Sequence, residues 1–308
     1  MSRMRGVDFQ GQAVIVTGGT RGIGAGIARA FLLAGAQVLV CGRTEPESGS
    51  ESGPESGSGP ESDRGPAAAF TRADVRDPDQ ARGLIQAAIG LFGRVDVLVS
   101  NAGGSPPAPA ATASPRFHAK VIELNLIAPL HVAQAANEVM QGQPGGGSIL
   151  MIGSVSGTRP SPGTAAYGAA KAGLHHLATS LAVEWAPKVR VNTVAPGLVA
   201  TDSAAAHYGD PPAARPGGPP AARPGDPPAA GPGDPPVAGH GAAAGMAAAA
   251  RTVPLGRMAT PEDIAAACLF LASPLASYIS GAALALHGGG ERPAFLAGAD
   301  GSVYIPRK

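Results

Sequence analysis

The feature that most constrains this fold is a regular alternation of short apolar runs with longer amphipathic runs. The short runs are rich in valine, isoleucine and leucine, as buried parallel strands are. The longer runs repeat apolar residues three and four positions apart, as helices with one buried face do. This alternation predicts an α/β protein with a doubly wound, mostly parallel sheet of seven strands and helices on both faces.

The expected elements follow from these two periodicities and from glycine and proline punctuation. The predicted strands cover residues 12–17, 37–41, 68–73, 95–100, 147–153, 189–194 and 282–287. The predicted helices cover residues 22–33, 78–92, 119–140, 165–185 and 261–271.

Two segments interrupt this pattern. Residues 45–66 form a Ser/Gly/Glu/Pro tract, and residues 209–240 are four copies of an eight-residue unit that begins as GDPPAARP. Neither composition can bury enough apolar surface to offset the entropy of ordering, so we expect a flexible insertion and a disordered, polyproline-like repeat. Roughly 250 residues remain, a size that fits one α/β domain spanning residues 1–308.

The composition excludes several classes of partner. The 308 residues carry 23 basic and 22 acidic side chains, and a net charge of +1 offers no attraction to nucleic acid or an anionic membrane. Small molecules or copies of the chain are the expected partners. Cys41 and Cys268 lack metal-ligand spacing and H-E-x-x-H is absent, so no metal is predicted. With no leader-like or membrane-spanning run, we expect a cytoplasmic protein.

A glycine-rich turn joins the first predicted strand to the first predicted helix. TGGTRGIG, residues 17–24, places Gly18, Gly22 and Gly24 where the backbone could turn tightly and approach a pyrophosphate. The alternative is a tight turn that binds nothing. The flanking strand and helix favour a dinucleotide site.

The end of the second predicted strand indicates which dinucleotide binds. An acidic residue there would accept a hydrogen bond from a ribose 2′-hydroxyl, whereas arginine suits a 2′-phosphate. Arg43 occupies this position, and Arg21 lies in the glycine turn. NADP(H) is therefore favoured, while Glu45 keeps NAD(H) as the alternative.

Four polar residues form the predicted catalytic group: Asn125, Ser154, Tyr167 and Lys171. Tyr167 and Lys171 are four apart at the start of a helix and so share one face. Ser154 ends a strand at the carboxyl edge of the sheet, where ligands of such folds bind. Taken singly, each has a purely structural interpretation: a strand cap for Ser154, a packing ring for Tyr167, a solvated charge for Lys171 and a helix kink for Asn125. Their combined spacing favours one shared site.

The chemistry of carbonyl reduction explains these residue types. A tyrosine can protonate the carbonyl oxygen, but its ordinary pKa of about 10 is too high for reversible use near neutrality. The Lys171 ammonium could lower that pKa, and Ser154 could polarise the carbonyl. Asn125 could hold a water or a helix backbone group that links Lys171 to solvent.

The chain resembles the short-chain dehydrogenase/reductase family, in its form with one Rossmann domain. The resemblance rests on TGGTRGIG, on SNAG at residues 100–103, on ELNL around Asn125, on Ser154 thirteen residues before YGAAK, and on VRVNTVAPG at residues 189–197. It covers nearly the whole chain outside the two insertions. It implies an NAD(P)(H)-dependent oxidoreductase that interconverts a secondary alcohol and a ketone.

The resemblance also implies which further residues would contact the cofactor. Asp74 would contact the adenine, Asn101 and Gly103 would form the wall behind the adenosine ribose, and the loop after Pro196 would hold the nicotinamide carboxamide. The expected set beyond the residues named above is Thr20, Ile23, Val75, Gly197, Val199 and Thr201. Helices 119–140 and 165–185 resemble a pair that forms a subunit interface, which implies a homotetramer or homodimer.

The remaining alternatives concern nearby histidines, other activities and the substrate. The helical offsets of His175 and His176 predict rings turned away from Tyr167, so both are left out of the site. A serine hydrolase would need G-x-S-x-G, which is absent. A non-catalytic dinucleotide sensor would be expected to lack Tyr167 or Lys171. Ala/Gly/Pro-rich loops favour a medium-sized apolar or alicyclic carbonyl compound as substrate.

Overall fold

The computed structural model describes residues 7–45, 67–202, 204 and 240–290 of the chain. Apart from Glu45 and His240, the two predicted insertions lie outside these residues, so their expected conformations remain predictions. No described helix combines the length and apolarity needed to cross a bilayer.

Seven strands form one sheet in the order β3-β2-β1-β4-β5-β6-β7, and every neighbouring pair is parallel. This confirms the doubly wound α/β class. The strands are β1 Ala13–Thr17, β2 Gln37–Gly42, β3 Ala69–Arg72, β4 Val97–Ser100, β5 Gly147–Ile152, β6 Val189–Pro196 and β7 Ala283–Leu286.

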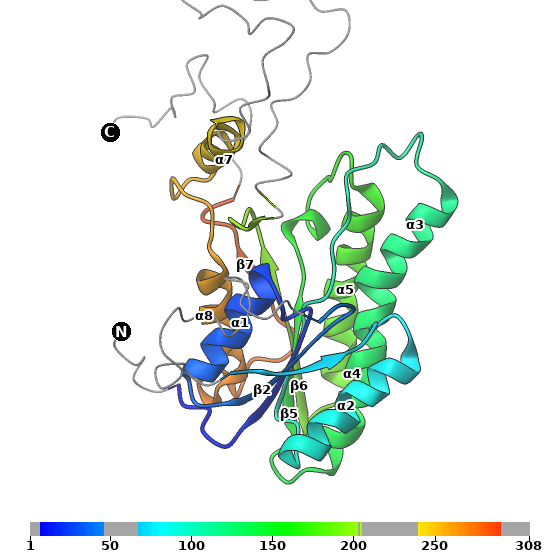
Figure 1. Ribbon diagram of the computed structural model, residues 1–308, viewed down its shortest axis with the longest axis vertical. Coiled ribbons are helices and arrows are strands. Elements are labelled where there is room, and N and C mark those ends of the chain that lie inside the picture. The colour runs from blue at the N-terminus through cyan, green and yellow to red at the C-terminus, as the bar shows by residue number, and fades with distance from the viewer. Residues whose placement is uncertain (1–6, 46–66, 203, 205–239, 291–308) are drawn as a thin grey trace, which may run out of the picture.

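The helices cover both faces of this sheet (Figure 1). Helices α1 and α8 pack against one face, and helices α2, α4 and α5 pack against the other. The bounds are α1 Gly22–Leu33, α2 Pro78–Phe92, α3 Pro115–Ile122, α4 Ala128–Gly142, α5 Ala165–Glu184, α7 His240–Thr252 and α8 Pro261–Ala272.

The alternation of side chains along each strand divides the core in two. On β1, Val14 and Val16 join the apolar cluster under α1 and α8, whereas Ile15 joins the cluster under α2, α4 and α5. All three are fully buried, which explains why this strand is apolar on both faces up to Val16.

The predicted helix over residues 119–140 is the clearest difference from expectation. It begins earlier, at Pro115, and is interrupted by a π-helical turn over Glu123–Ile127 between α3 and α4. Pro129 has no N–H to donate to the carbonyl of Asn125, and its ring would clash with that carbonyl in a regular α-helix. The widened turn removes this conflict and turns the Asn125 side chain toward the loop after β4.

Helix α7 was not predicted. Its sequence, HGAAAGMAAAART, is rich in alanine, which has the highest helix propensity, but it has no spaced apolar residues. Two 3₁₀ turns, η3 Val155–Gly157 and η4 Pro274–Ala276, also lie between predicted elements. The first of them follows Ser154 directly.

A cleft at the topological switch point

Strand order reverses between β1 and β4, and a cleft of about 740 Å³ lies beyond the carboxyl ends of these strands. Ligands of open α/β sheets bind at such reversals, because the connecting helices leave in opposite directions there. Hydrogen bonds join the two strand ends. The Thr17 hydroxyl accepts from the backbone N–H groups of Asn101 and Ala102 at 2.9 and 3.0 Å, and the Asn101 amide donates to the carbonyls of Thr17 and Gly18 at 2.9 and 3.1 Å.

The glycine turn forms the floor of the cleft at the start of α1. Gly18 and Gly22 have φ angles of +63° and +54°, a left-handed conformation that glycine adopts without strain. A Cβ on Gly24 would lie 2.2 Å from the Gly18 carbonyl oxygen, so no larger residue fits there. No capping side chain among the described residues bonds to the α1 N-terminus, where backbone N–H groups favour an anion. These features fit a dinucleotide pyrophosphate.

Every residue predicted to bind the cofactor lines this cleft. The set comprises Gly18, Thr20, Arg21, Gly22, Ile23, Gly24, Arg43, Asp74, Val75, Asn101, Gly103, Tyr167, Lys171, Pro196, Gly197, Val199 and Thr201. The structure therefore brings these residues together from the ends of five strands and the start of two helices, and their individual contacts with a cofactor stay predictions.

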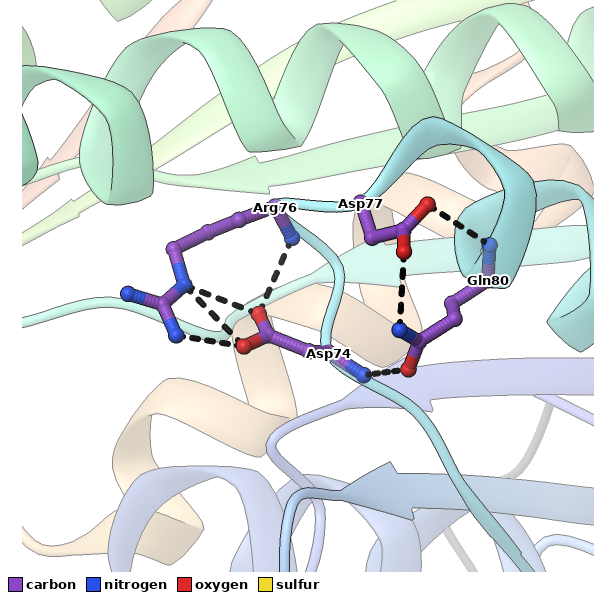
Figure 2. Close-up of polar contacts among 4 residues, drawn as sticks. All are labelled: Asp74, Arg76, Asp77 and Gln80. Carbon is purple, nitrogen blue, oxygen red and sulfur yellow. Dashed lines mark hydrogen bonds and ion pairs between the residues drawn. The ribbon is translucent and has the colours of Figure 1, made fainter.

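Asp74 carries a partner that the sequence did not indicate. Figure 2 shows the Arg76 guanidinium facing both carboxylate oxygens of Asp74, with Nε at 2.9 and 3.2 Å and Nη2 also within bonding distance. The same guanidinium holds the pKa of Asp74 below its usual range. The Gln80 side chain fixes the loop by accepting from the Asp74 N–H at 2.9 Å and donating to Asp77 at 2.9 Å. Asp74 is thus ionised and held in place at the edge of the cleft.

Three of the four predicted catalytic residues, Ser154, Tyr167 and Lys171, line the other end of the cleft. The Lys171 ammonium lies 5.6 Å from the centre of the Tyr167 ring and donates to the Ile152 carbonyl at 2.7 Å. Burial lowers the pKa of Lys171 to about 8. The Ser154 hydroxyl accepts from the Ser156 N–H at 3.1 Å, which leaves its own proton to be donated elsewhere.

The fourth residue, Asn125, is fully buried behind the cleft wall and does not line it. Its amide accepts from the Gly104 N–H at 2.8 Å and donates to the Gly104 and Val121 carbonyls, both at 2.9 Å. Its oxygen would lie 2.8 Å from a Cβ on Gly103, and the Lys171 ammonium would lie 3.4 Å from the same point. Asn125 therefore fixes the loop that lies beside Lys171.

His175 does not line the cleft, but it has a contact that the sequence did not indicate: its Nε2 accepts a hydrogen bond from the Ser154 backbone N–H at 3.4 Å. His175 lies on α5 and Ser154 follows β5, so the spacing of residues along α5 gives no information about this contact. His176 is exposed, as its offset suggested.

Sequence reasoning also missed part of the cleft lining. Most of these residues are apolar or glycine and flank the predicted ones, so only proximity to them could have indicated a role. The added lining residues are Cys41, Thr44, Ala73, Arg76, Ala102, Gly104, Leu124, Ile152, Gly153, Leu198 and Ala204.

Comparison with known proteins identifies the family. Residues 12–210 match the family described as short chain dehydrogenase, and residues 230–291 match one described as enoyl-(acyl carrier protein) reductase. The chain is 34% identical over 286 residues to the cis-4-hydroxycyclohexanecarboxylate dehydrogenase of Sinomonas cyclohexanicum, covering 92% of this chain and 98% of that one. It is 32% identical over 283 residues to 3beta-hydroxysteroid dehydrogenase 1 of Eggerthella lenta, covering 92% and 94%.

A solved structure of another dehydrogenase has a fold similar to that of this chain. A 7 alpha-hydroxysteroid dehydrogenase in complex with NADH and 7-oxo glycochenodeoxycholic acid superposes with a TM-score of 0.71 at 27% identity, covering 95% of this chain and 99% of that one. The family match spans more than half of the sequence and agrees with the parallel sheet and the cleft at its switch point. The chain belongs to the short-chain dehydrogenase/reductase family of NAD(P)-dependent oxidoreductases.

Proposed function

We propose that this protein interconverts a secondary alcohol and a ketone with NADP(H), using Tyr167 as the acid/base. One observation carries the proposal: Ser154, Tyr167 and Lys171 share a cleft with a glycine turn suited to a dinucleotide. The bound dinucleotide supplies or accepts the hydride. The alternative of a non-catalytic sensor is not favoured, since the tyrosine and the lysine are both present.

The side chains divide the remaining chemistry among them. During reduction, the Ser154 hydroxyl donates to the carbonyl oxygen and stabilises the negative charge that develops there. The Tyr167 hydroxyl gives its proton to the same oxygen. The Lys171 ammonium, close to the Tyr167 ring, favours the phenolate that remains. Asn125 acts through the loop that it fixes beside Lys171.

The preference for NADP(H) over NAD(H) is supported by the charges at the adenosine end. Arg21 and Arg43 line this part of the cleft and are exposed, so both can meet a 2′-phosphate. Arg76 is paired with Asp74, which cancels one charge of each sign. Glu45 is then the acidic residue that opposes the two arginines.

The substrate class is supported by two lines of reasoning. The relatives include dehydrogenases named for a hydroxycyclohexane carboxylate and for hydroxysteroids, both of which carry an alcohol on an alicyclic ring. The loop after β4 is rich in alanine and proline, which suits an apolar ring. We therefore propose an alicyclic secondary alcohol or its ketone. Assembly as a homotetramer or homodimer through α4 and α5 is proposed from the family resemblance.

The Tyr167→Phe variant tests the mechanism. It keeps the ring and removes the acidic proton, so we expect kcat for ketone reduction to fall by about 10²-fold or more. The measurement is NADPH oxidation with a panel of substituted cyclohexanones and oxosteroids. NADPH affinity, followed by cofactor fluorescence, should change little. A variant with near-normal turnover would refute the assignment, and a wild-type protein that binds NADPH without oxidising it across the panel would favour the sensor.

A further inference from the structure

The ring of His175 fills a space beside the end of β5. A Cβ on Gly153 would lie 2.3 Å from His175 Nε2 and 2.7 Å from Thr193 Cγ2, so these three residues are closely packed. The next residue, Ser154, donates its backbone N–H to the same Nε2. Because Gly153 has no side chain, the His175 imidazole has room to lie against the end of β5.

This contact requires a neutral imidazole with its proton on Nδ1, since a protonated Nε2 cannot accept a hydrogen bond. Burial and the positive charge of Lys171, one turn earlier on α5, both lower the pKa of His175. Among the described neighbours, Gly153 before η3 and Thr193 on β6 carry no charge. The surroundings therefore favour the form of the ring that can hold Ser154.

We propose that His175 is a positioning residue for Ser154, whose backbone amide it holds while neutral and releases when protonated. The proposal rests on the role of Ser154 in the proposed function. Ser154 is extended, with φ −168° and ψ 151°, and its hydroxyl caps the turn that follows. A shift of its amide therefore moves the hydroxyl that would donate to the carbonyl oxygen, and misplacement by about 1 Å can lower turnover by 10²-fold.

Two substitutions at this position separate hydrogen bonding from packing. His175→Leu keeps a comparable volume but removes the acceptor, and we expect kcat to fall about 10-fold or more at pH 7.5 with the KM for NADPH within twofold of wild type. His175→Gln places an amide oxygen near the position of Nε2, and we expect it to retain most of the wild-type kcat. His176→Leu, on the exposed neighbour, is the matched control and should leave kcat unchanged.

The pH profile adds a readout that a purely structural role would not change. Wild-type kcat should decline on the acid side of 6.5, the ordinary pKa of histidine, because the pKa of His175 is lowered and its protonation removes the acceptor. His175→Gln cannot titrate, so this acidic decline should disappear. The proposal is overturned by a Leu variant with wild-type kcat, by a Gln variant as impaired as the Leu variant, or by an unchanged acidic decline in the Gln variant.

Nuclear magnetic resonance of ¹⁵N-histidine-labelled full-length protein separates this proposal from the proposed reaction. An Nδ1-protonated His175 whose titration shifts the Ser154 amide would establish the contact even if no ketone is reduced, in which case the reaction assignment fails. A fully active enzyme whose His175 carries its proton on Nε2 at pH 7.5 would overturn the positioning role and leave the reaction assignment intact.

Discussion

At the scale of single residues, Lys171 shows a conflict between folding and chemistry. The residue is 4% exposed, and its ammonium donates to the Ile152 carbonyl, which compensates only partly for its lost hydration. Burial lowers its pKa to about 8 from an ordinary value of about 10.4. Between these two values the unfolded chain binds more protons than the folded chain, so the free energy of unfolding rises with pH in this window. Below pH 8 the full destabilisation is present.

Lys171→Met should therefore stabilise the fold while abolishing turnover. At pH 7 we expect the free energy of unfolding to rise by about 1 to 3 kcal/mol, after allowing for the hydrogen bond lost at Ile152. At pH 10.5 the gain should be small, because the wild-type lysine is then neutral in the folded chain and about half neutral in the unfolded chain. Urea unfolding of both proteins at the two pH values measures this difference. A Met variant less stable than wild type at pH 7 would contradict it.

Arg43 is the residue on which the cofactor preference is tested. Arg43→Asp removes a charged contact to a 2′-phosphate and supplies an acceptor for a ribose 2′-hydroxyl, so the ratio of kcat/KM for NADPH over NADH should fall by about 10-fold or more. Steady-state kinetics with both cofactors provides the measurement. Arg72→Asp, on the exposed end of β3 and outside the cleft lining, is the control. An unchanged ratio in the Arg43 variant would place this side chain away from the ribose.

At the scale of elements, much of the fold could be predicted because local signals agree with tertiary packing. Helices α1 and α2 have the predicted bounds, and α2 is delimited by local chemistry: Asp77 caps its start, Pro78 opens it, and Gly93 ends it with φ +75°. Helix α7 lacked an apolar stripe, so periodicity gave no signal for it. The candidate site could be predicted from residue types and their spacing along the chain. The contact between His175 and Ser154 could not, because it joins α5 to the end of β5 and neither local pattern shows that they meet.

The π turn between α3 and α4 leads to an element-scale prediction. Asn125→Ala would remove the buried amide that bonds to the N–H and carbonyl of Gly104 and to the carbonyl of Val121, and each lost hydrogen bond costs about 0.5 to 1.5 kcal/mol. We expect the free energy of unfolding to fall by about 2 to 4 kcal/mol, measured in urea. The control is Asn137→Ala on α4, whose side chain accepts a hydrogen bond from exposed Gln141 and should change stability by less than about 0.5 kcal/mol. If both variants lowered the free energy of unfolding equally, the hydrogen bonds between Asn125 and Gly104 would add no more stability than an ordinary surface contact.

At the scale of the whole molecule, two exposed apolar surfaces could join copies of the chain. Val183 on α5 is 77% exposed on the helix pair proposed as the interface, while Leu275 and Tyr278 are exposed after α8. We expect a tetramer or dimer by light scattering at micromolar concentration, and Val183→Glu should lower its mass. Tyr278→Glu is the matched variant on the other surface. Loss of assembly only in the Tyr278 variant would place the interface on the surface that follows α8. A monomeric wild-type protein would refute the proposed assembly.

The sheet order also sets the sequence in which the cleft can be completed. β1 pairs with β2 within 24 residues, as Ala13 beside Gln37 shows, but its other neighbour is β4, with Val14 beside Val97. Closing such a long loop costs entropy before the contact returns any free energy, and parallel sheets of high contact order fold slowly for that reason. During synthesis the glycine turn emerges early, yet Pro196 and Thr201 emerge about 180 residues later. We therefore expect cofactor binding to recover late during refolding, once the sheet is complete.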